Sequence, residues 1–484
     1  MEWLTITDIR EGLQKKLFSV SELTSTYLER IATLDSKINS FISVREEEVQ
    51  AEADIADKRI REGKTRVLEG VPFAIKDNLM LKGGCTTAGS NILKDYSAVY
   101  TATAVQKLLD VGAIILGKTN MDEFAMGSST EYSAFGPTKN PHDMSRVPGG
   151  SSGGSAAAIA ADFCTAALGS DTGGSIRQPA SFCGVVGFKP TYGRVSRYGL
   201  IAMSSSLDQI GPITKTVEDA ALVYSIISGE DKCDPTSSTI KCGSVNLQKK
   251  SSLKGKRFGI PKSFVGFEIE KSVQAVFDRA LADLRSAGAE ICEIDIPLSR
   301  MSLAVYYLMV TSEISSNLAR YDGIRYGTRV DVQDLIGQYI AARTQGFGEE
   351  AKRRILLGTF TLSKGYRDKY YKQALAVKEA IGAQFDKGLA GCDALISLTS
   401  PTSPFKLGEK FEDPLTMYLS DLFTVSANIA NLPAISLPLL SEHLPVGFQM
   451  MGKRFGDAEL LSLASACEDL FGKAQPAKSL KPVS

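Results

Sequence analysis

Histidine is scarce in this chain of 484 residues, which contains only His142 and His443. A site that needs several imidazoles, such as a His-rich zinc centre, is therefore nearly excluded. A Ser-His-Asp triad is constrained less severely, because it needs a single histidine. We expect that any catalytic base in this protein is a residue other than histidine.

The chain also lacks paired cysteines, long apolar runs and an excess of charge of either sign. Its eight cysteines are scattered and form no C-x-x-C pair, which is typical of free thiols in a reducing cytosol. No uncharged apolar stretch reaches about 18 residues, and the N-terminus shows no secretory signal. The 55 basic and 55 acidic residues cancel, which disfavours a free-standing nucleic-acid binder. We therefore expect a cytoplasmic protein without a membrane span.

Strand and helix patterns alternate along most of the chain. Strand signals stand at 41–44, 71–77, 113–117, 258–260, 290–296, 394–398, 434–437 and 446–451. Helical patterns stand at 23–34, 46–62, 103–112, 155–161, 273–287, 417–430 and 457–470, and a capping box at Ser19–Glu22 precedes the first of them. Such alternation predicts an α/β fold with a largely parallel central sheet.

Two clusters of glycine and serine, Gly149–Gly154 and Asp171–Arg177, flank an Ala-rich run. Glycine lets the backbone adopt positive φ, so that several amide N–H groups can converge on one point. A serine at such a point indicates a hydroxyl nucleophile beside an oxyanion-binding nest. In the second cluster, Ser175 would attack a carbonyl carbon while the N–H groups around Thr172–Gly174 hold its oxygen. The alternative is a pair of flexible glycine turns.

Lys76 is the candidate base. It closes the apolar run 71–75, and a lysine that loses hydration there would have a lowered pKa and could act as a neutral amine. The alternative is a lysine whose ammonium reaches the surface. Spacing along the chain does not by itself place Lys76 near Ser175.

The first cluster also matches G-x-S-x-G, the nucleophile elbow of α/β-hydrolases, with Ser151 or Ser152 at its centre. That motif requires a strand immediately before it. Residues 140–148 contain two prolines and several turn formers, so the elbow context is absent. His443 would have to complete the triad from a predicted surface loop, which makes this interpretation the weaker one.

Together, Lys76, Gly149–Gly154 and Gly173–Arg177 resemble the amidase signature family, and the resemblance extends over essentially the whole chain. Further segments resemble the tRNA-dependent amidotransferase branch of that family: 124–131, 139–141, 187–196 and 413–418. The resemblance implies one α/β/α domain over 1–484, with a large mixed, mostly parallel sheet covered by helices. Its parts would be a helical N-terminal part (about 1–65), a signature core (about 66–228), a surface connection (about 229–256) and a C-terminal α/β part (about 257–484).

The resemblance also implies roles for individual residues. Ser175 would be the nucleophile, Ser151 a bridging serine with a cis peptide bond, and Lys76 the base. The oxyanion would be held near Thr172, Gly173 and Gly174. Substrate-binding residues would be Tyr306, Arg354, Asp421, Met126, Gly127 and Ser128, with Arg354 on the α-carboxylate of free glutamine and Asp421 on its α-ammonium. Adjacent Tyr307 and Arg353 remain alternatives for Tyr306 and Arg354.

The implied activity is glutamine hydrolysis, with the ammonia passed on to convert misacylated Glu-tRNA(Gln), or also Asp-tRNA(Asn). The implied partners are a large subunit that handles ATP and tRNA and a small wrapping subunit. ATP with magnesium would be used by the partner, and we expect neither a cofactor nor a metal in this chain. A stand-alone amidase acting on small or lipid amides is the main alternative, although an apolar amide has no use for both Arg354 and Asp421. A catalytically silent scaffold is the other, and competent residues at all three triad positions disfavour it.

Overall fold

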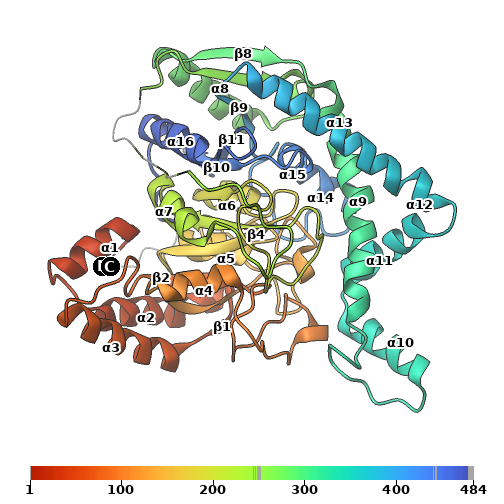
Figure 1. Cartoon of the computed structure of the whole chain (residues 1–484), viewed down its shortest axis with the longest axis horizontal. Helices are drawn as coiled ribbons and strands as arrows, with labels where there is room; N and C mark the ends of the chain where they lie inside the picture. The colour runs from red at the N-terminus through yellow and green to blue at the C-terminus, as the bar shows by residue number, and fades with distance from the viewer. Residues whose placement is uncertain are drawn as a thin grey trace.

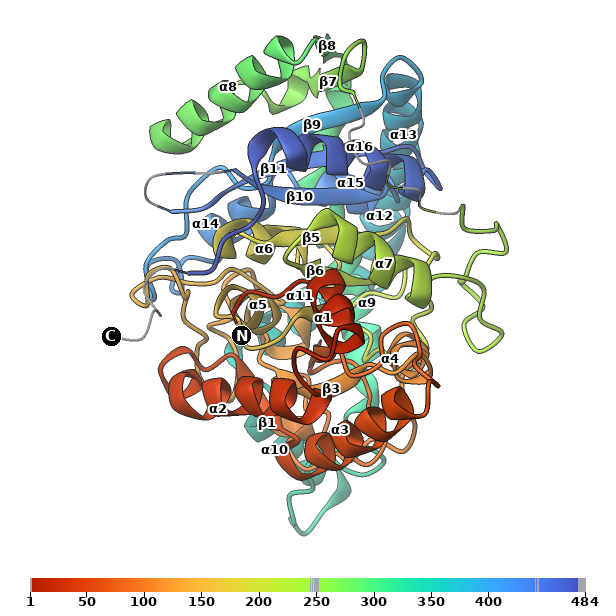
Figure 2. The same ribbon diagram turned by 90° about the vertical axis from the view of Figure 1, so that its left-hand side faces the viewer.

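The computed structural model describes residues 2–243, 245, 247, 252–439, 441 and 444–477, so His443 lies outside the described residues. One sheet of eleven strands runs through them, from β1 at one edge to β8 at the other (Figures 1 and 2). In spatial order the strands are β1 (Phe41–Val44), β3 (Ile114–Thr119), β2 (Pro72–Lys76), β4 (Ala166–Asp171), β6 (Gln209–Thr214), β5 (Val186–Lys189), β10 (Ala434–Leu439), β11 (Val446–Met451), β9 (Ala394–Leu398), β7 (Arg257–Pro261) and β8 (Glu290–Ile294).

The α/β class and the mixed sheet are confirmed, but the expectation of a mostly parallel sheet is corrected. Parallel pairing is confined to β3–β2–β4 and to β9–β7–β8. The six other pairings of described strands are antiparallel. Two causes are visible. Residues 440–445 alone separate β10 from β11, and a connection that short joins antiparallel strands. In addition, β6 lies between β4 and β5 and runs antiparallel to both, so this one strand accounts for two of the six antiparallel pairings.

The N-terminal helices are α1 (Ile6–Gln14), α2 (Val20–Ile38) and α3 (Glu46–Arg61), which lie together on one side of the molecule, at the left of Figure 1. The predicted capping box is present at the start of α2. The Glu22 amide donates to Ser19 Oγ (3.1 Å), and the Ser19 amide donates to Glu22 Oε2 (2.8 Å). Two backbone donors that have no partner inside the helix are thereby satisfied.

Four helices cover the central strands: α4 (Thr103–Asp110), α5 (Gly153–Ala160), α6 (Arg177–Cys183) and α7 (Val217–Ile227). All residues of α5 and α6 are buried. Each of these two helices begins at one of the glycine-serine clusters. The small side chains of α5 let it pack closely, and the two clusters are thus carried into the interior.

The C-terminal part contributes α8 (Lys271–Ser286) and α16 (Asp457–Phe471) beside its strands, both as predicted. The predicted helix 417–430 is wrong: it is divided into α14 (Pro414–Tyr418), a turn at Leu419–Asp421, and α15 (Val425–Ile429). The break is held by Thr424, whose Oγ1 donates to the carbonyls of Gly173 (2.7 Å) and Asp421 (3.1 Å). It turns Asp421 and Thr424 toward the second cluster.

Four helices that the sequence patterns did not predict form what we call the arm: α9 (Ser302–Asn317), α10 (Leu335–Gly346), α11 (Glu349–Leu362) and α12 (Tyr366–Lys369). Helix α13 (Tyr371–Ala390) follows them. Figure 1 shows α9 and α11 running along one side of the molecule and α10 projecting at the lower right. The described residues of the predicted surface connection, 229–256, contain no helix or strand. None of the described helices combines the length and the apolar content needed to cross a membrane.

Candidate active site

The two glycine-serine clusters lie against each other in the interior. The Ser152 amide donates to the Ser175 carbonyl (3.1 Å), and the Gly150 amide donates to Gln178 Oε1 (2.9 Å). All residues from Gly149 to Gln178 are buried. The clusters are therefore one hydrogen-bonded unit and not two flexible turns.

Lys76 reaches this unit from the end of β2. Its Nζ lies 2.8 Å from Ser151 Oγ, 3.0 Å from Ser170 Oγ and 3.3 Å from the Ser170 carbonyl. The side chain is 0% exposed, which rules out the surface alternative. Burial lowers the pKa of Lys76 to about 7, although nearby carboxylates, Asp122 first among them, oppose the shift. An amine with this pKa is neutral in a large fraction of molecules near neutral pH.

Ser151 and Ser175 take different positions within the unit. The Gly150–Ser151 peptide bond is cis, as the resemblance implies, and Ser151 Oγ is in contact with Lys76. The Ser175 hydroxyl makes no hydrogen bond to any described residue, and the residue is 7% exposed. The structure thus brings Lys76 into direct contact with Ser151, whereas Ser151 and Ser175 are joined through the backbone of Ser152. The Ser175 hydroxyl is left available for a substrate.

The predicted oxyanion turn runs between β4 and Ser175. Thr172 Oγ1 donates to Asp208 (2.7 Å), and Gly174 has a φ of 144°, a region that favours glycine. A Cβ on Gly173 would lie 2.7 Å from Cζ of Tyr306, so no larger residue fits there. The amides of Gly173, Gly174 and Ser175 donate to no described residue, and they are thus available to bind an oxyanion.

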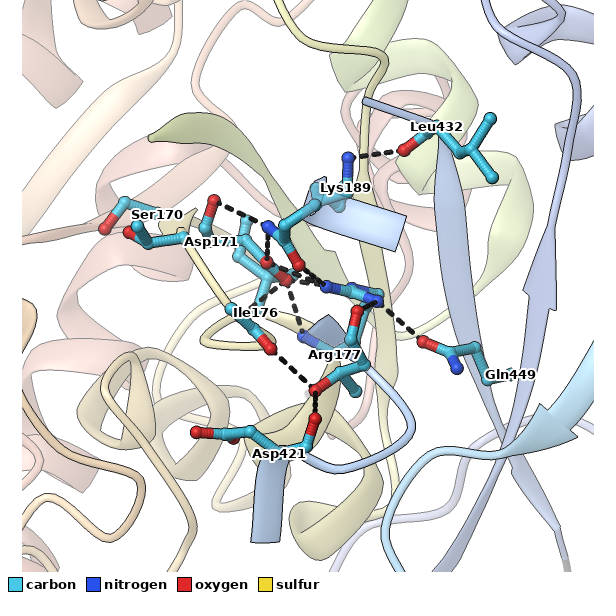
Figure 3. A network of polar contacts seen from close by, with 12 residues as sticks. Ser170, Asp171, Ile176, Arg177, Lys189, Asp421, Leu432 and Gln449 are labelled. Carbon is cyan, nitrogen blue, oxygen red and sulfur yellow. Dashed lines mark hydrogen bonds and ion pairs between the residues drawn. The ribbon is translucent and has the colours of Figure 1, made fainter. Parts of the chain in front are cut away.

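A buried ionic network that the sequence analysis missed holds this turn in place (Figure 3). The Arg177 guanidinium donates to both carboxylate oxygens of Asp171, with Nε–Oδ2 and Nη2–Oδ1 distances of 2.9 Å. It also donates to Gln449 Oε1 (2.6 Å) and Asn428 Oδ1 (2.6 Å) from the C-terminal part. Burial would raise the pKa of Asp171, but Arg177 outweighs it and the pKa is lowered to about 2. The sequence contains one signal for this network: Asp171 and Arg177 are the charged residues in the segment 166–177, whose other residues are small or apolar.

The predicted residues Met126, Gly127 and Ser128 lie on a loop that wraps around Asp122, which was also missed. The Asp122 carboxylate accepts the amides of Thr130 (2.9 Å) and Tyr132 (3.2 Å). Gly127 packs directly on it, because a Cβ there would lie 2.4 Å from Asp122 Cγ. Burial raises the pKa of Asp122 to about 6. The loop brings Ser128 to the edge of the first cluster, where the Ser128 carbonyl accepts from Gln178 Nε2 (3.0 Å).

Arg354 and Asp421, which are predicted to bind the α-carboxylate and the α-ammonium of glutamine, are called the glutamine clamp below. Ser128 connects the loop to Asp421. Ser128 Oγ donates to Asp421 Oδ2 (2.7 Å). Burial raises the pKa of Asp421 to about 7, against the opposing effects of this hydrogen bond and of the Arg354 charge. A cationic ligand group would stabilise the ionised carboxylate.

The structure separates the two candidate arginines on α11. Arg354 is 3% exposed, whereas the side chain of Arg353 is 43% exposed. Arg354 Nε donates to Glu350 Oε1 (2.7 Å), and its other two nitrogens make no hydrogen bond to a described residue. Arg353 also pairs with Glu350, from the outer side. Of the two arginines, Arg354 is therefore the one whose two terminal nitrogens are buried and donate to no described residue.

The two candidate tyrosines on α9 face different parts of the site. Tyr306 is buried against Gly173 of the oxyanion turn. Tyr307 stacks on Tyr418 with ring centroids 4.0 Å apart, and the Arg354 guanidinium lies 5.5 Å from the Tyr307 ring. Tyr306 thus adjoins the reacting centre, and Tyr307 shapes the surroundings of Arg354.

The hydrolase elbow is not formed. Residues 140–148 contain isolated β-bridges but no strand before Ser151. His142 Nε2 lies 2.9 Å from the Cys183 carbonyl, at the far end of α6 from Ser175. The geometry supports the serine–lysine interpretation of the site.

Comparisons with known proteins identify relatives in sequence and in fold. A family model described as Amidase matches residues 22–461. The chain is 52% identical over 470 residues to the A subunit of the glutamyl-tRNA(Gln) amidotransferase of Caldanaerobacter subterraneus subsp. tengcongensis, covering 97% of this chain and 96% of that protein. The crystal structure of the Thermotoga maritima protein of the same name is 44% identical, covers 98% of both chains and has a TM-score of 0.81.

Backbone similarity extends to amidases with other names. The native peptide amidase of Stenotrophomonas maltophilia has a TM-score of 0.82 and covers 99% of both chains, but it is only 29% identical. The fold is therefore shared across several enzymes, and the sequence identity is what separates them.

Proposed function

The chain belongs to the amidase family, and we propose that it acts as the A subunit of a glutamyl-tRNA(Gln) amidotransferase, hydrolysing glutamine to supply ammonia. The observation that carries the assignment is the identity of 52% over nearly the whole length of a relative with that name. The site supports it, because Ser128 and Gln178 connect the glycine-serine unit that holds the serine–lysine pair to the buried carboxylate of Asp421.

The reaction begins with Lys76 as a neutral amine. Across the 2.8 Å between Nζ and Ser151 Oγ, the lone pair of the amine accepts the Ser151 proton. The Ser175 hydroxyl must turn toward Ser151 Oγ when substrate binds, and Ser151 then takes its proton as Ser175 Oγ attacks the side-chain amide carbon of glutamine. The free amides of Gly173, Gly174 and Ser175 hold the oxyanion of the tetrahedral intermediate.

Collapse of the intermediate breaks the carbon–nitrogen bond. The proton held by the relay passes to the leaving nitrogen, so that ammonia departs and a γ-glutamyl ester of Ser175 remains. Water, activated by the same relay, then hydrolyses the ester and releases glutamate. The net reaction consumes one glutamine and one water and yields one glutamate and one ammonia.

Glutamine is held at its α-carbon by opposite charges. The two unused nitrogens of Arg354 suit the α-carboxylate in a bidentate arrangement, and Asp421 suits the α-ammonium. Tyr306 closes the site beside the oxyanion turn. An amide without these two charged groups would leave the two buried nitrogens of Arg354 without an acceptor, which disfavours apolar amides.

The proposed assembly contains this chain, a large subunit that handles ATP with magnesium and the misacylated tRNA, and a small wrapping subunit. Glu-tRNA(Gln), and also Asp-tRNA(Asn), would be the acceptors, and the complex would act in the cytoplasm. The balanced charge of the chain fits this division of labour, because this subunit need not hold the tRNA itself.

The test compares the glutaminase activity of the chain alone, with its partner subunits, and with misacylated tRNA and ATP added. We expect low activity alone and a stepwise increase. Full activity alone, unchanged by the partners and the tRNA, would favour a stand-alone amidase. That activity is the second candidate, because the backbone is equally similar to that of the peptide amidase.

A further inference from the structure

The two halves of the glutamine clamp come from different elements of the fold. Arg354 lies on α11 of the arm, and Asp421 lies in the turn Leu419–Asp421, after β9. The α-carboxylate and the α-ammonium of free glutamine are attached to a single carbon atom. The two halves must therefore be held at a fixed separation to bind both groups at once.

Arg354 is held in place within α11 by Glu350. Its Nε donates to Glu350 Oε1 (2.7 Å), one helical turn earlier, and Arg353 pairs with the other oxygen of that carboxylate. Burial would lower the pKa of Arg354, but the charge of Glu350 outweighs it and the pKa is raised, so the guanidinium stays charged. These contacts lie within one helix, and they do not fix Arg354 relative to Asp421.

Tyr418 forms the contact between the two elements. Its hydroxyl donates to Glu350 Oε1 (2.9 Å), the same oxygen that accepts from Arg354. Its ring lies 5.2 Å from the Arg354 guanidinium and stacks on Tyr307 of α9, with ring centroids 4.0 Å apart. Burial raises the pKa of Tyr418, so its hydroxyl stays protonated and donates. Tyr418 thus contacts both members of the Arg354–Glu350 pair.

Tyr418 is also connected to Asp421 through a short stretch of helical backbone. It is the last residue of α14 and directly precedes the turn Leu419–Asp421. Its φ of −64° and ψ of −30° continue the helical path into that turn. Side chains three residues apart in a 3₁₀ turn lie on the same side of it. Any displacement of Tyr418 relative to α11 would therefore change the separation of Arg354 and Asp421.

Other contacts of α11 do not take over this role. The helix is attached to α9 near its C-terminal end, where Ser312 Oγ lies 2.7 Å from Thr361 Oγ1. On its outer side Leu356 is 69% exposed. Among the described residues from 394 onward, Tyr418 alone forms a hydrogen bond to α11. The position of Arg354 relative to Asp421 thus depends on this tyrosine.

We propose that Tyr418 is a positioning residue of the glutamine site, whose hydroxyl on Glu350 holds Arg354 at the separation from Asp421 that glutamine requires. This inference rests on the proposed function and specifies how the α-carboxylate is bound. Tyr418 acts on that carboxylate through Arg354. Loss of its hydroxyl should weaken glutamine binding equally in the ground state and the transition state, which raises KM and leaves kcat unchanged.

The test measures the glutaminase kinetics of Tyr418→Phe in the complex with the two partner subunits. The variant keeps the ring and its stacking on Tyr307 and removes the hydroxyl alone. We expect the KM for glutamine to rise by about tenfold, the change that corresponds to the loss of one hydrogen bond to a charged group. An unchanged KM, or a fall in kcat without a rise in KM, overturns the inference.

A double-mutant cycle with Arg354→Ala shows whether Tyr418 acts through Arg354. In the Arg354→Ala background, Tyr418→Phe should change the KM for glutamine by less than about twofold, because the group that it positions is absent. A merely structural role would lower activity by the same factor in both backgrounds. An equal rise of KM in both backgrounds overturns the inference.

Tyr27→Phe is the matched control. Tyr27 is a buried tyrosine on α2 whose hydroxyl lies 3.2 Å from Thr165 Oγ1, so this variant also loses one buried hydrogen bond. Its KM for glutamine should equal that of the wild type. A rise as large as that of Tyr418→Phe would mean that KM follows a general loss of stability, and the positioning role would be refuted.

Glu350→Gln tests the same contact from its other end and provides a second variant should Tyr418→Phe fold poorly. It preserves the shape of the side chain and removes the charge that holds Arg354, so KM should rise and kcat should be unchanged. A wild-type complex that hydrolyses no glutamine overturns the proposed function itself. A complex that hydrolyses glutamine, with a wild-type KM in both Tyr418→Phe and Glu350→Gln, overturns the positioning role alone.

Discussion

The reaction core around Lys76 and the arm of α9–α12 meet at one site, but they differ in which side chains they bury. The core buries charged groups, and the arm exposes apolar ones. In the core, Lys76, Asp171 and Arg177 are buried and held by several hydrogen bonds each. In the arm, Ile336 and Leu356 are largely exposed, while Arg354 is buried with two unused nitrogens.

The difference corresponds to two tasks. The hydrogen bonds of the buried core fix the distance between base and serine, and burial shifts the pKa of Lys76 toward neutrality. The arm leaves two donors of Arg354 free for the substrate on its inner side. Substitutions in the core should therefore affect chemistry and stability, and substitutions in the arm should affect binding.

The largest effect is expected for Ser175→Ala. Removing the nucleophile should reduce glutamine-dependent amidation by about ten-thousandfold or more. The fold should be intact, because the Ser175 hydroxyl bonds to no described residue, and amidation with added ammonia should persist. Steady-state assays of the assembled complex with either nitrogen donor measure this. Continued use of glutamine by the variant would remove Ser175 as the nucleophile.

Lys76→Ala should reduce glutamine hydrolysis by about a thousandfold, the range of general-base catalysis. The wild-type pH profile tests the same role without a mutation. Lys76 must be neutral to act, so kcat should rise with pH up to its pKa of about 7 and then level off. A profile of kcat that is flat from about pH 6 to pH 8 would contradict the role of Lys76 as the base.

The pH profile also distinguishes the role of Lys76 in the core from that of Asp421 in the glutamine clamp. Asp421 must be ionised to hold the α-ammonium, and its pKa is also about 7. Below that pH, kcat/KM should therefore fall more steeply than kcat in the wild type. In Asp421→Asn, the fall of log kcat/KM with decreasing pH should have the slope expected for the titration of one group, Lys76.

Arg177→Met tests how far the core depends on its buried ion pair. The variant leaves the Asp171 carboxylate buried without its partner, which typically costs about 3–5 kcal/mol of unfolding free energy. Urea denaturation followed by circular dichroism measures it. The matched control is Arg177→Met/Asp171→Asn, which removes both charges and should recover part of the loss. A single variant within about 0.5 kcal/mol of the wild type would refute the structural role.

The smallest effect is expected in the arm. Arg354→Ala should raise the KM for glutamine by about 10- to 150-fold, because a hydrogen-bonded charge contributes about 1.5–3 kcal/mol. Ammonia-supported turnover should be unchanged. Arg353→Ala is the control and should change KM by less than about threefold, since its side chain is half exposed. If Arg353→Ala raised the KM for glutamine more than Arg354→Ala, then Arg353 would be the residue that binds the α-carboxylate.

Much of the core could be predicted from the sequence because its signals are local. The strand that ends at Lys76, the clusters around Ser151 and Ser175 and the capping box at Ser19 depend on adjacent residues. The predicted strands lie within two residues of observed ones. The roles of the site residues stay predictions, although the structure brings Lys76 and Ser151 into contact.

The arm and the sheet direction could not be predicted in the same way. Exposed Ile336 and Leu356 blur the apolar stripe by which a surface helix is recognised. Arg177 is held by partners far away in sequence, such as Gln449, which lies 272 residues from it. Strand direction likewise depends on which strands become neighbours, and β6 lies between β4 and β5 without a local signal.

The bonds from Arg177 to Asn428 and Gln449, and from Thr424 to Gly173, have a consequence for engineering. A polypeptide that ends at Ile227 would contain Lys76 and both glycine-serine clusters, yet it would lack every group from 424 onward that holds the turn before Ser175. The signature is thus a contiguous sequence motif but not a transplantable catalytic module. Any attempt to build a minimal amidase from it, or to divide the chain into two complementing fragments, must keep residues 421–449 together with the first half.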